Sequence, residues 1–357
     1  MKNPIEIRPD EALEELTTFQ RKLTHGFQNL LEMGDEIPTG VTPREVIYQE
    51  DKMTLYRYQP STTAVQNPVP VLIVYALVNR PYMTDLQDNR STVKGLLEAG
   101  MDVYLIDWGY PDRSDRYLGL DDYLNGYLDR CVDVICERHK RDAINLLGIC
   151  QGGTFSLCYS AMHPEKVANL VTMVTPVDFQ TPDNMLSAWV QHVDIDLVAD
   201  TLGTIPGEML NWTFLNLKPY RLIMQKYIDM VDVLEDKKQI DGFLRMEKWI
   251  FDSPDQAGEA YRQFLKDFYQ QNKLINGGLV IGDYEVDLKN VTMPVLNVFA
   301  TEDHLVPPDA SKALKNVVGT KDYTEISFKG GHIGIYVSGR AQKEVPPSIG
   351  RWLDERT

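Results

Sequence analysis

The sequence has 357 residues, of which 43% are hydrophobic and 25% charged, and its formal net charge is −16. This length suits one large α/β domain with an insertion, and the composition is that of a globular protein. The negative charge argues against a nucleic-acid partner and against simple adhesion to anionic membranes, because both need clustered lysine and arginine.

The termini and the cysteines indicate where the protein works. The N-terminus, MKNPIEIRPDEALEEL, lacks the apolar stretch of a signal peptide, and the longest apolar run, VPVLIVYALV at 69–78, is too short to span a bilayer. The four cysteines do not form a disulfide framework and include no C-x-x-C pair: Cys131, Cys136, Cys150 and Cys158. We therefore expect a cytoplasmic protein with reduced thiols and no transmembrane segment.

The first predicted element is an amphipathic helix over residues 11–33. Asp10 can cap its start and Gly34 lies at its far end. Its apolar residues recur at helical spacing: Leu13, Leu16, Phe19, Leu23, Phe27, Leu30 and Leu31. Packing on the body of the same domain is the favoured role of this face, and docking of a partner is the alternative.

Alternating strand and helix patterns follow. Helical patterns such as STVKGLLEAG and LDDYLNGYLDRCVDVICERH lie between compact apolar runs. Those runs, which we predict to be strands, cover 55–59, 70–76, 102–108, 144–150 and 169–175. Near-continuous apolar strands that alternate with helices indicate a mostly parallel sheet covered on both faces, which is an α/β fold.

From about residue 178 to 290 the pattern changes to aromatic-rich helical segments, such as NMLSAWVQHV and FLRMEKWIF. Strand-like runs return at 294–300 and 323–328. The middle block therefore reads as an insertion between late strands of one sheet. We predict a core over 1–177 and 291–357, and a mainly helical cap over 178–290 that covers the carboxyl ends of the strands.

The stretch INLLGIC, followed by QGGTFSLCYSAMHP, reads as a strand, a sharp turn and a helix, the context of a nucleophile elbow. Gly148 and Gly152 leave room for the turn, and Gly153 lets the helix approach the sheet. Cys150 would then stand at the helix N-terminus, where the helix dipole favours a thiolate. A structural cysteine at a buried helix start is the alternative.

A thiol nucleophile needs a base, and the base needs an orienting acid. His332, in KGGHIG, follows the last predicted strand, and Asp303, in ATEDHLVPP, follows the strand before it. Both would project at the edge of the sheet where Cys150 lies, in the chain order nucleophile, acid, histidine. We predict that these three residues form a catalytic triad.

Other polar residues compete for the same roles. Glu302 is the alternative acid, and we prefer Asp303 because it precedes the turn LVPP. His304 is expected to be structural or to face the substrate, and His139 and His163 to be surface residues at helix ends. A metal site built from the same aspartate and histidines lacks a supporting ligand spacing. We expect no metal and no cofactor.

An acyl-transfer site also needs backbone N–H groups that meet the oxyanion of a tetrahedral intermediate. One comes from the residue after the nucleophile, here Gln151. The other comes from a loop after an early strand, here LVNRPYMTD after VLIVYA. Val78 is the candidate in that loop, to within one residue either way.

A cysteine where this turn usually carries serine favours acyl transfer over hydrolysis. Attack of Cys150 on a thioester gives another thioester, so the acyl group stays activated for a second acceptor. An aromatic cap would keep water away from that intermediate. Two alternatives stay open: a thiol-dependent hydrolase of esters or thioesters, and a non-catalytic scaffold that keeps the fold.

Several long motifs resemble the catalytic subunit of polyhydroxyalkanoate synthases, which have the α/β-hydrolase fold: GICQGG, YALVNRPYMTD, YLIDWG, VTPVDF, KWIFDSPDQAGEAYRQF, DHLVPP and GGHIGIYVSG. The resemblance runs from about residue 5 to the end, and the short chain matches class III, with class IV similar in size. It implies polymerisation of (R)-3-hydroxyacyl-CoA, with 3-hydroxybutyryl-CoA as the expected monomer, into polyester with release of CoA. It also implies that Cys150 is the nucleophile, His332 the general base and Asp303 the third catalytic residue.

The same resemblance implies partners and a location. Class III catalytic subunits are similar to one another in requiring a second, noncatalytic (PhaE-like) subunit, and the family dimerises through the cap and works at polymer granules. We therefore expect a homodimer within a hetero-oligomer at the granule surface, with the helix at 11–33 and the apolar cap as contact surfaces. Whether Asp303 orients His332 or helps it to activate the monomer hydroxyl stays open.

Overall fold

The computed structural model describes residues 13–15, 17–18, 20–22, 37–60, 67–234 and 236–357. The described residues between 13 and 22 are helical, as the pattern at 11–33 predicts. The remainder of that predicted helix lies outside the described residues.

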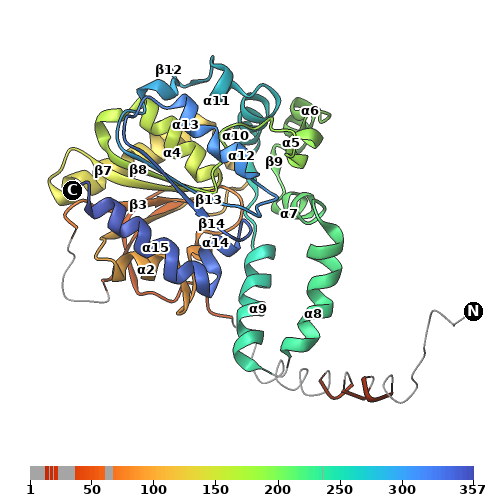
Figure 1. The fold of residues 1–357 in the computed structure, drawn as a ribbon. Coiled ribbons are helices and arrows are strands. Elements are labelled where there is room, and N and C mark those ends of the chain that lie inside the picture. Colours follow the sequence, from red (N-terminus) through yellow and green to blue (C-terminus); the bar gives the residue numbers. More distant parts are fainter. Residues whose placement is uncertain (1–12, 16, 19, 23–36, 61–66, 235) are drawn as a thin grey trace, which may run out of the picture.

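Within the described ranges, eight strands form one sheet in the order β1-β2-β6-β3-β7-β8-β13-β14 (Figure 1). They are β1 (Arg44–Glu50), β2 (Met53–Tyr58), β3 (Val71–Val74), β6 (Val103–Asp107), β7 (Ile144–Ile149), β8 (Val167–Met173), β13 (Val295–Ala300) and β14 (Tyr323–Phe328). β2 is antiparallel to both of its neighbours, and every pair from β6 to β14 is parallel. The predicted α/β fold with a mostly parallel sheet is therefore confirmed.

Each predicted strand lies on an observed one, but the sequence pattern missed β1. This strand pairs with β2 at the sheet edge, with a register shift between Val46 and Tyr48. Val46 is 57% exposed. An edge strand with an irregularity does not show the clean alternation of buried and exposed residues by which strands are recognised.

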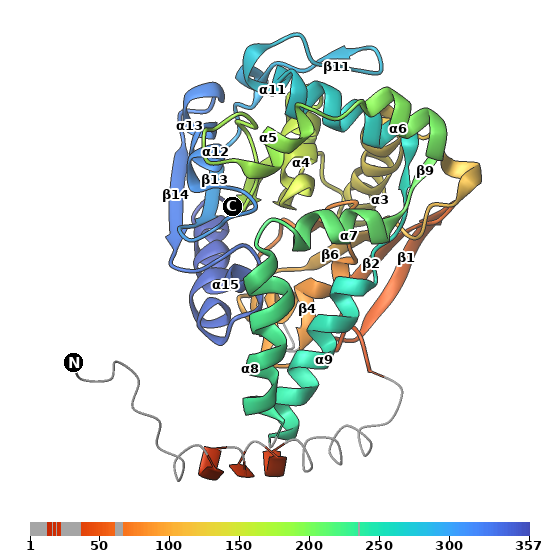
Figure 2. The same cartoon turned by 90° about the vertical axis from the view of Figure 1, so that its right-hand side faces the viewer.

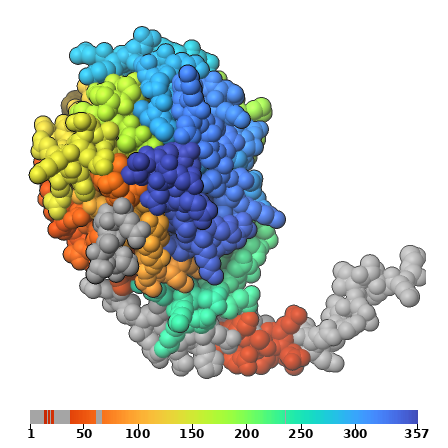
Figure 3. All heavy atoms as spheres, turned by 60° about the vertical axis from the view of Figure 1, so that its left-hand side comes forward, coloured from red at the N-terminus to blue at the C-terminus, as the bar shows by residue number. Residues whose placement is uncertain are grey.

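Helices cover both faces of the sheet, because successive side chains of each strand point to opposite faces. On one face, Leu72 and Val74 of β3 join a buried cluster with α3 (Asp129–His139) and α4 (Gln151–Met162). On the other, Val71 and Ile73 join a cluster with α2 (Thr92–Glu98) and α15 (Gly339–Asp354). Figure 2 shows α3 and α4 on their side of the sheet, and Figure 3 shows the C-terminal residues, in dark blue, at the molecular surface.

The last helix, α15, was not expected, because Pro346 and Pro347 lie in its interior. Proline removes an intrahelical hydrogen bond and usually ends a helix. Here Pro346 packs on α2, where a Cβ on Gly95 would lie 2.6 Å from the Pro346 Cβ. The tight contact between the two helices holds α15 in place despite its prolines.

Residues 174–294 connect the adjacent strands β8 and β13. The helices there are α5 (Met185–Val190), α6 (Ile195–Leu202), α7 (Gly207–Leu215), α8 (Lys226–Val233), α9 (Lys237–Phe251), α10 (Gly258–Gln263) and α11 (Lys273–Asn276), with π-helical turns over Tyr220–Gln225 and Phe264–Gln270. The prediction of helical segments over this block includes these helices, although it did not single out α6 or α8. Figures 1 and 2 show α8 and α9 as a helical hairpin that projects from the body.

Not all of this insertion stands apart from the sheet. The ring of Phe264, just after α10, lies 5.8 Å from the ring of Phe155 in α4, and both belong to the cluster beside the sheet. The predicted division into a core and a cap at 178–290 stays a prediction.

The remaining elements are short. They are β4 (Asp85–Gln87), β5 (Arg90–Ser91), β9 (Thr204–Ile205), β10 (Gln256–Ala257), β11 (Val280–Ile281), β12 (Tyr284–Glu285), α12 (Pro308–Lys312), α13 (Leu314–Val317) and α14 (Gly334–Val337), and a π-helical turn over Asp122–Leu128 precedes α3. In the described ranges, no helix combines the length and apolarity needed to cross a bilayer.

Candidate active site

Cys150 stands in the tight turn between β7 and α4. Its φ of 55° and ψ of −124° form a conformation that residues other than glycine rarely adopt. A Cβ on Gly152 would collide with the carbonyl oxygen of Val74, and one on Gly148 would collide with the Cα of Gly153. The glycines therefore allow the turn to pack closely against the sheet, and the predicted elbow is present in the structure.

Asp303 and His332 meet beyond the carboxyl ends of β13 and β14. His332 Nδ1 donates to Asp303 Oδ2 at 2.7 Å. The other oxygen of Asp303 accepts from the N–H groups of Leu305 and Val306, each at 2.9 Å. Only 1% of the Asp303 side chain and 5% of the His332 side chain is exposed. The turn after β13 therefore holds the carboxylate in a single orientation beside the imidazole.

The protonation of His332 depends on both of its neighbours. Burial is the largest influence on its pKa and lowers it, but the charges of Asp303 and Cys150 and the hydrogen bonds to both raise the pKa to about 10. Because Nδ1 is used by Asp303, the other ring nitrogen of His332 remains available to the nearby Cys150. The structure thus brings together the three residues that the sequence motifs singled out.

The other three thiols have different surroundings. Burial raises the pKa of Cys131 and of Cys158 far above the ordinary value, and it raises that of Cys136 to about 11. Since the thiolate is the nucleophile, these residues are poorly suited to attack. Among the four cysteines, all within the described ranges, Cys150 is the one that influences the pKa of a histidine.

The competing residues occupy other positions. Glu302 is exposed, whereas its neighbour Asp303 is buried against the imidazole. His304 is half-buried, and burial, followed by the charge of Lys218, lowers its pKa. In the described part of the chain, no three His, Cys, Asp or Glu side chains form a group that could hold a metal ion.

His139 and His163 end helices, as predicted, but they are half-buried and not surface residues. The Nε2 of His139 lies 2.9 Å from the hydroxyl of Tyr104. The Nε2 of His163 lies 2.9 Å from Oδ1 of Asn125. Both rings therefore have structural partners, which the helix-end pattern did not reveal.

The two predicted oxyanion donors belong to different elements. Gln151 is the first residue of α4, where N–H groups lack an intrahelical acceptor. Val78 is in the loop after β3, and within the described residues its N–H has no protein acceptor. The neighbouring N–H of Leu77 does have one, because it donates to Gln151 Oε1 at 2.9 Å. The role of Gln151 and Val78 stays a prediction.

Three buried tyrosines near Cys150 were missed by the sequence analysis. Tyr75, Tyr269 and Tyr336 are buried, and burial raises the pKa of each phenol. The charge of Cys150 raises these pKa values further, and Tyr75 and Tyr336 are joined by a hydrogen bond. Tyr75 ends a predicted strand and Tyr336 follows His332 by four residues, so their nearness to two motifs was the available signal.

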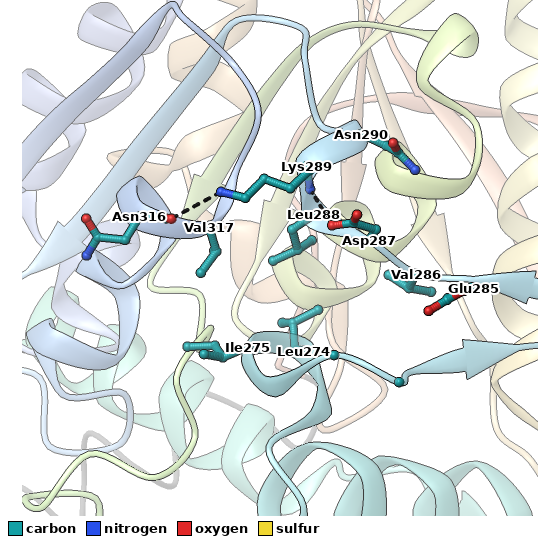
Figure 4. A pocket seen from close by; sticks show the side chains of 12 residues that line it. Leu274, Ile275, Glu285, Val286, Asp287, Leu288, Lys289, Asn290, Asn316 and Val317 are labelled. Carbon is teal, nitrogen blue, oxygen red and sulfur yellow. Dashed lines mark hydrogen bonds between the residues drawn. The ribbon is translucent and has the colours of Figure 1, made fainter.

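A hollow of about 530 Å³ lies elsewhere, between α11, the segment after β12 and α13 (Figure 4). Leu274, Val286 and Val317 are among the side chains that line it, and Lys289 Nζ spans part of it to reach the Asn316 carbonyl oxygen at 3.3 Å. None of the predicted site residues lines this hollow.

Comparison with known families agrees with the geometry. Residues 69–338 match the family described as the alpha/beta hydrolase fold, and residues 11–96 match the family described as the N-terminus of poly-beta-hydroxybutyrate polymerase (PhaC). Among solved structures, a soluble variant of monoglyceride lipase from Saccharomyces cerevisiae covers 90% of this chain at a TM-score of 0.55, with 98% of its own length matched. At 13% sequence identity that similarity concerns the fold alone.

Curated relatives extend the similarity to the whole chain. The poly(3-hydroxyalkanoate) polymerase subunit PhaC of Allochromatium vinosum is 66% identical over 354 residues, which are 99% of both chains. The subunit of the same name from Synechocystis is 57% identical and covers 97% of this chain and 94% of its own. With an eight-stranded hydrolase-type sheet and a match over nearly its full length, this chain belongs to the α/β-hydrolase superfamily and, within it, to the PhaC family of poly(3-hydroxyalkanoate) polymerase subunits.

Proposed function

We propose that this chain is the catalytic subunit of a class III type polyhydroxyalkanoate synthase, which transfers (R)-3-hydroxyacyl groups from CoA to Cys150 and onward to a growing polyester. The observation that carries the proposal is the buried pair of His332 and Asp303, hydrogen-bonded at 2.7 Å, with Cys150 near enough to raise the pKa of His332. The names of the curated relatives support the substrate class.

In the first half-reaction, the sulfur of Cys150 forms a bond to the acyl carbon and the carbon–sulfur bond to CoA breaks. The proton that His332 takes from the Cys150 thiol leaves with the CoA thiol. The product is an acyl-cysteine thioester, which is about as reactive as the thioester that was consumed.

In the second half-reaction, the hydroxyl oxygen of a 3-hydroxyacyl unit attacks that thioester. His332 takes the hydroxyl proton, an ester bond forms, and Cys150 leaves as a thiolate that recovers the proton. Asp303 either orients His332 or helps it to activate the hydroxyl, and the hydrogen bond to Nδ1 is compatible with both roles. The N–H groups of Gln151 and Val78 stabilise the oxyanion in each half-reaction, and loss of one such donor costs about 3 kcal/mol.

The surroundings of the site support the exclusion of water from the intermediate. Tyr75, Tyr269 and Tyr336 are buried near enough to Cys150 for its charge to raise their pKa values, each with less than a tenth of its surface exposed. Residues 178–290 act as the cap in this proposal, with their carboxyl-terminal part packed beside α4. A dry, enclosed thioester favours transfer to a hydroxyl over hydrolysis.

The proposal includes assembly with a noncatalytic second subunit, a homodimer and attachment to polyester granules. Large apolar side chains are exposed over the predicted cap, as contact surfaces require. They include Met185, Trp189, Leu197, Trp212, Met224 and Ile228.

The test is incubation with 3-hydroxybutyryl-CoA, with and without the noncatalytic subunit, followed by mass analysis. We expect a 3-hydroxybutyryl group on Cys150 and high-mass polyester in solution. Cys150→Ser should lower polyester formation by about a thousandfold or more. The matched control is Cys136→Ser, which changes a half-buried thiol on α3 and should keep the wild-type rate.

Two outcomes would contradict the proposal. Free 3-hydroxybutyrate without polymer would show a thiol hydrolase. Equal alkylation rates of Cys150 and Cys136 by iodoacetamide near neutral pH would favour a non-catalytic scaffold, because an activated thiolate reacts much faster than a thiol whose pKa is raised.

A further inference from the structure

The loop after β3 lies between the nucleophile elbow and the carboxyl end of α9. On the elbow side, the N–H of Leu77 donates to Gln151 Oε1 at 2.9 Å. Two residues later, Asn79 has a φ of 59°, a left-handed conformation that asparagine tolerates better than most residues. Val78, the predicted oxyanion donor, is the residue between these two.

The side-chain amide of Asn79 faces a group of oxygens at the end of α9. Its Nδ2 donates to Ser253 Oγ at 2.9 Å and lies 3.3 Å from the carbonyl oxygens of Trp249 and Ile250. It also lies 3.5 Å from Asn211 Oδ1, which accepts from Ser253 Oγ at 3.0 Å. Carbonyls in the last turn of a helix have few intrahelical donors. The Trp249 carbonyl also accepts from the N–H of Asp252 at 3.3 Å. The amide therefore matters most to the carbonyl of Ile250 and the hydroxyl of Ser253.

Neighbouring residues tie the same loop to α9. The carbonyl oxygen of Arg80 accepts from Trp249 Nε1 at 2.8 Å. The hydroxyl of Tyr82 donates to Asp252 Oδ2 at 3.0 Å. The loop is therefore fixed on one side by the elbow and on the other by α9, while the N–H of Val78, within the described residues, is left without a protein acceptor.

We propose that Asn79 is a positioning residue for acyl transfer: its amide holds the loop in the conformation that aims the Val78 N–H at the acyl oxygen on Cys150. This inference rests on the proposed function. Asn79 sets the direction of a donor and contacts neither Cys150 nor His332 in the described structure. Removal of the Asn79 amide should therefore destabilise the transition state and leave the thiol–imidazole pair unchanged.

The size of the effect follows from the chemistry of the oxyanion. Complete loss of one donor lowers kcat by about 10²–10³-fold. Asn79→Gly keeps the left-handed backbone conformation accessible but removes the side-chain amide. The Val78 N–H is then still present, but its orientation is less well fixed. We expect a fall in kcat of about tenfold to a hundredfold, with KM changed by less than about threefold. Asn79→Asp places a carboxylate against four oxygens and should lower kcat further.

The matched control is Asn67→Gly, in the segment that leads into β3. Asn67 is 3% exposed, and its Nδ2 ties the chain to the end of α15 through Asp354 Oδ1 at 2.7 Å and Thr357 Oγ1 at 3.0 Å. A merely structural role would make Asn79→Gly and Asn67→Gly alike, with lower thermal midpoints and unchanged kcat. A positioning role predicts that only Asn79→Gly loses kcat.

The experiment measures single-turnover acylation of Cys150 by 3-hydroxybutyryl-CoA and by p-nitrophenyl butyrate. It also measures alkylation of Cys150 by iodoacetamide across pH and the thermal midpoint of each variant. We expect slower acylation by Asn79→Gly with both acyl donors and an alkylation profile that matches the wild type. Ser253→Ala removes the 2.9 Å acceptor of the Asn79 amide together with the hydrogen bond from Ser253 Oγ to Asn211, and it should slow acylation by about threefold in a folded protein.

Different results overturn the two proposals. Wild-type rates of acylation in both Asn79→Gly and Ser253→Ala would overturn the positioning role, and so would a changed alkylation profile in Asn79→Gly. Acylation of the wild type by the ester but not by the CoA thioester would contradict the proposed function, and the variants would then be judged on the ester.

Discussion

The parallel sheet and the α8–α9 hairpin differ in how deeply their residues are buried. Every residue of β3, β7 and β13 is buried, and the candidate site lies at the carboxyl ends of these strands. In α8, by contrast, none of the described residues is buried. The comparison shows that close packing is concentrated where three side chains from distant parts of the sequence must meet.

The hairpin is held mainly through one face of α9. Ile240 and Trp249 of that helix are buried, and Arg245 Nη1 donates to the carbonyl oxygen of Pro38 at 2.6 Å. Its carboxyl end contacts the loop that carries Val78. The hairpin therefore combines an exposed helix, suited to contacts with partners, and a helix that supports the site.

The largest expected contrast between the two regions concerns the rate of polyester formation. Asp303→Asn should lower the rate of polyester formation by about 10³–10⁴-fold, because an amide cannot hold His332 in the same tautomer. In the hairpin, Glu247 bonds Lys226 Nζ at 2.8 Å and the Tyr227 hydroxyl at 2.8 Å, yet Glu247→Gln should change the rate by less than about threefold. Comparable losses in the two variants, or a similar loss in Glu302→Gln, would break the contrast.

A second contrast concerns the free energy of unfolding. Leu157 of α4 is 0% exposed, so Leu157→Ala should lower it by about 2–5 kcal/mol through lost burial and a cavity. Ile228 of α8 is 57% exposed, and Ile228→Ala should change it by less than about 0.5 kcal/mol. Urea denaturation measures both changes. Equal shifts in midpoint for the two variants would mean that Ile228 is buried in solution by contact with another surface.

Alanine substitutions at two glycines, one in α4 and one in α9, should differ less in their effect on the free energy of unfolding. A Cβ on Gly153 would collide with the buried Thr175, so Gly153→Ala should lower the free energy of unfolding by about 1–3 kcal/mol. A Cβ on Gly242 in α9 would lie 3.1 Å from the Gln87 side-chain oxygen, which can move aside. Because alanine favours a helix by about 1 kcal/mol, Gly242→Ala should be neutral to within that amount. A strongly destabilised Gly242→Ala protein would contradict this reading of the hairpin.

The last contrast between the two regions is a pH dependence. The pKa of His332 is raised from 6.5 to about 10 in the folded protein, so the stability it contributes is fully present below pH 6.5 and is lost as the pH rises toward 10. The difference in urea midpoint between wild type and His332→Gln should therefore shrink from pH 6.5 to pH 9.5. The difference between wild type and Ile228→Ala should stay constant over the same range, since neither side chain ionises. A His332→Gln difference that grows with pH would mean that the imidazole is held neutral.

The strands and the candidate triad were accessible from the sequence because their signals are local. The strand–turn–helix around Cys150 lies within a few consecutive residues, and Asp303 and His332 each follow a strand directly. The signals for β1 and α8 were weaker, since Val46 and Ile228 are exposed and buried faces provide the usual periodicity. The interior prolines of α15 argue against a helix in the local sequence. The contact with α2 that stabilises this helix is visible only in the tertiary structure.

By itself, the sequence determined the order of the strands along the chain, the tight turn at Cys150 and the identity of the three residues that end next to one another. Tertiary structure alone decided that Asn79 supports the loop beside Cys150 and that Tyr336 bonds Tyr75. The physical reason is the separation in sequence between the groups that interact. Backbone sterics and periodic burial act over a few residues, whereas hydrogen bonds such as that from Asn79 to Ser253 join groups 174 residues apart and exist only after the sheet and its insertion have folded together.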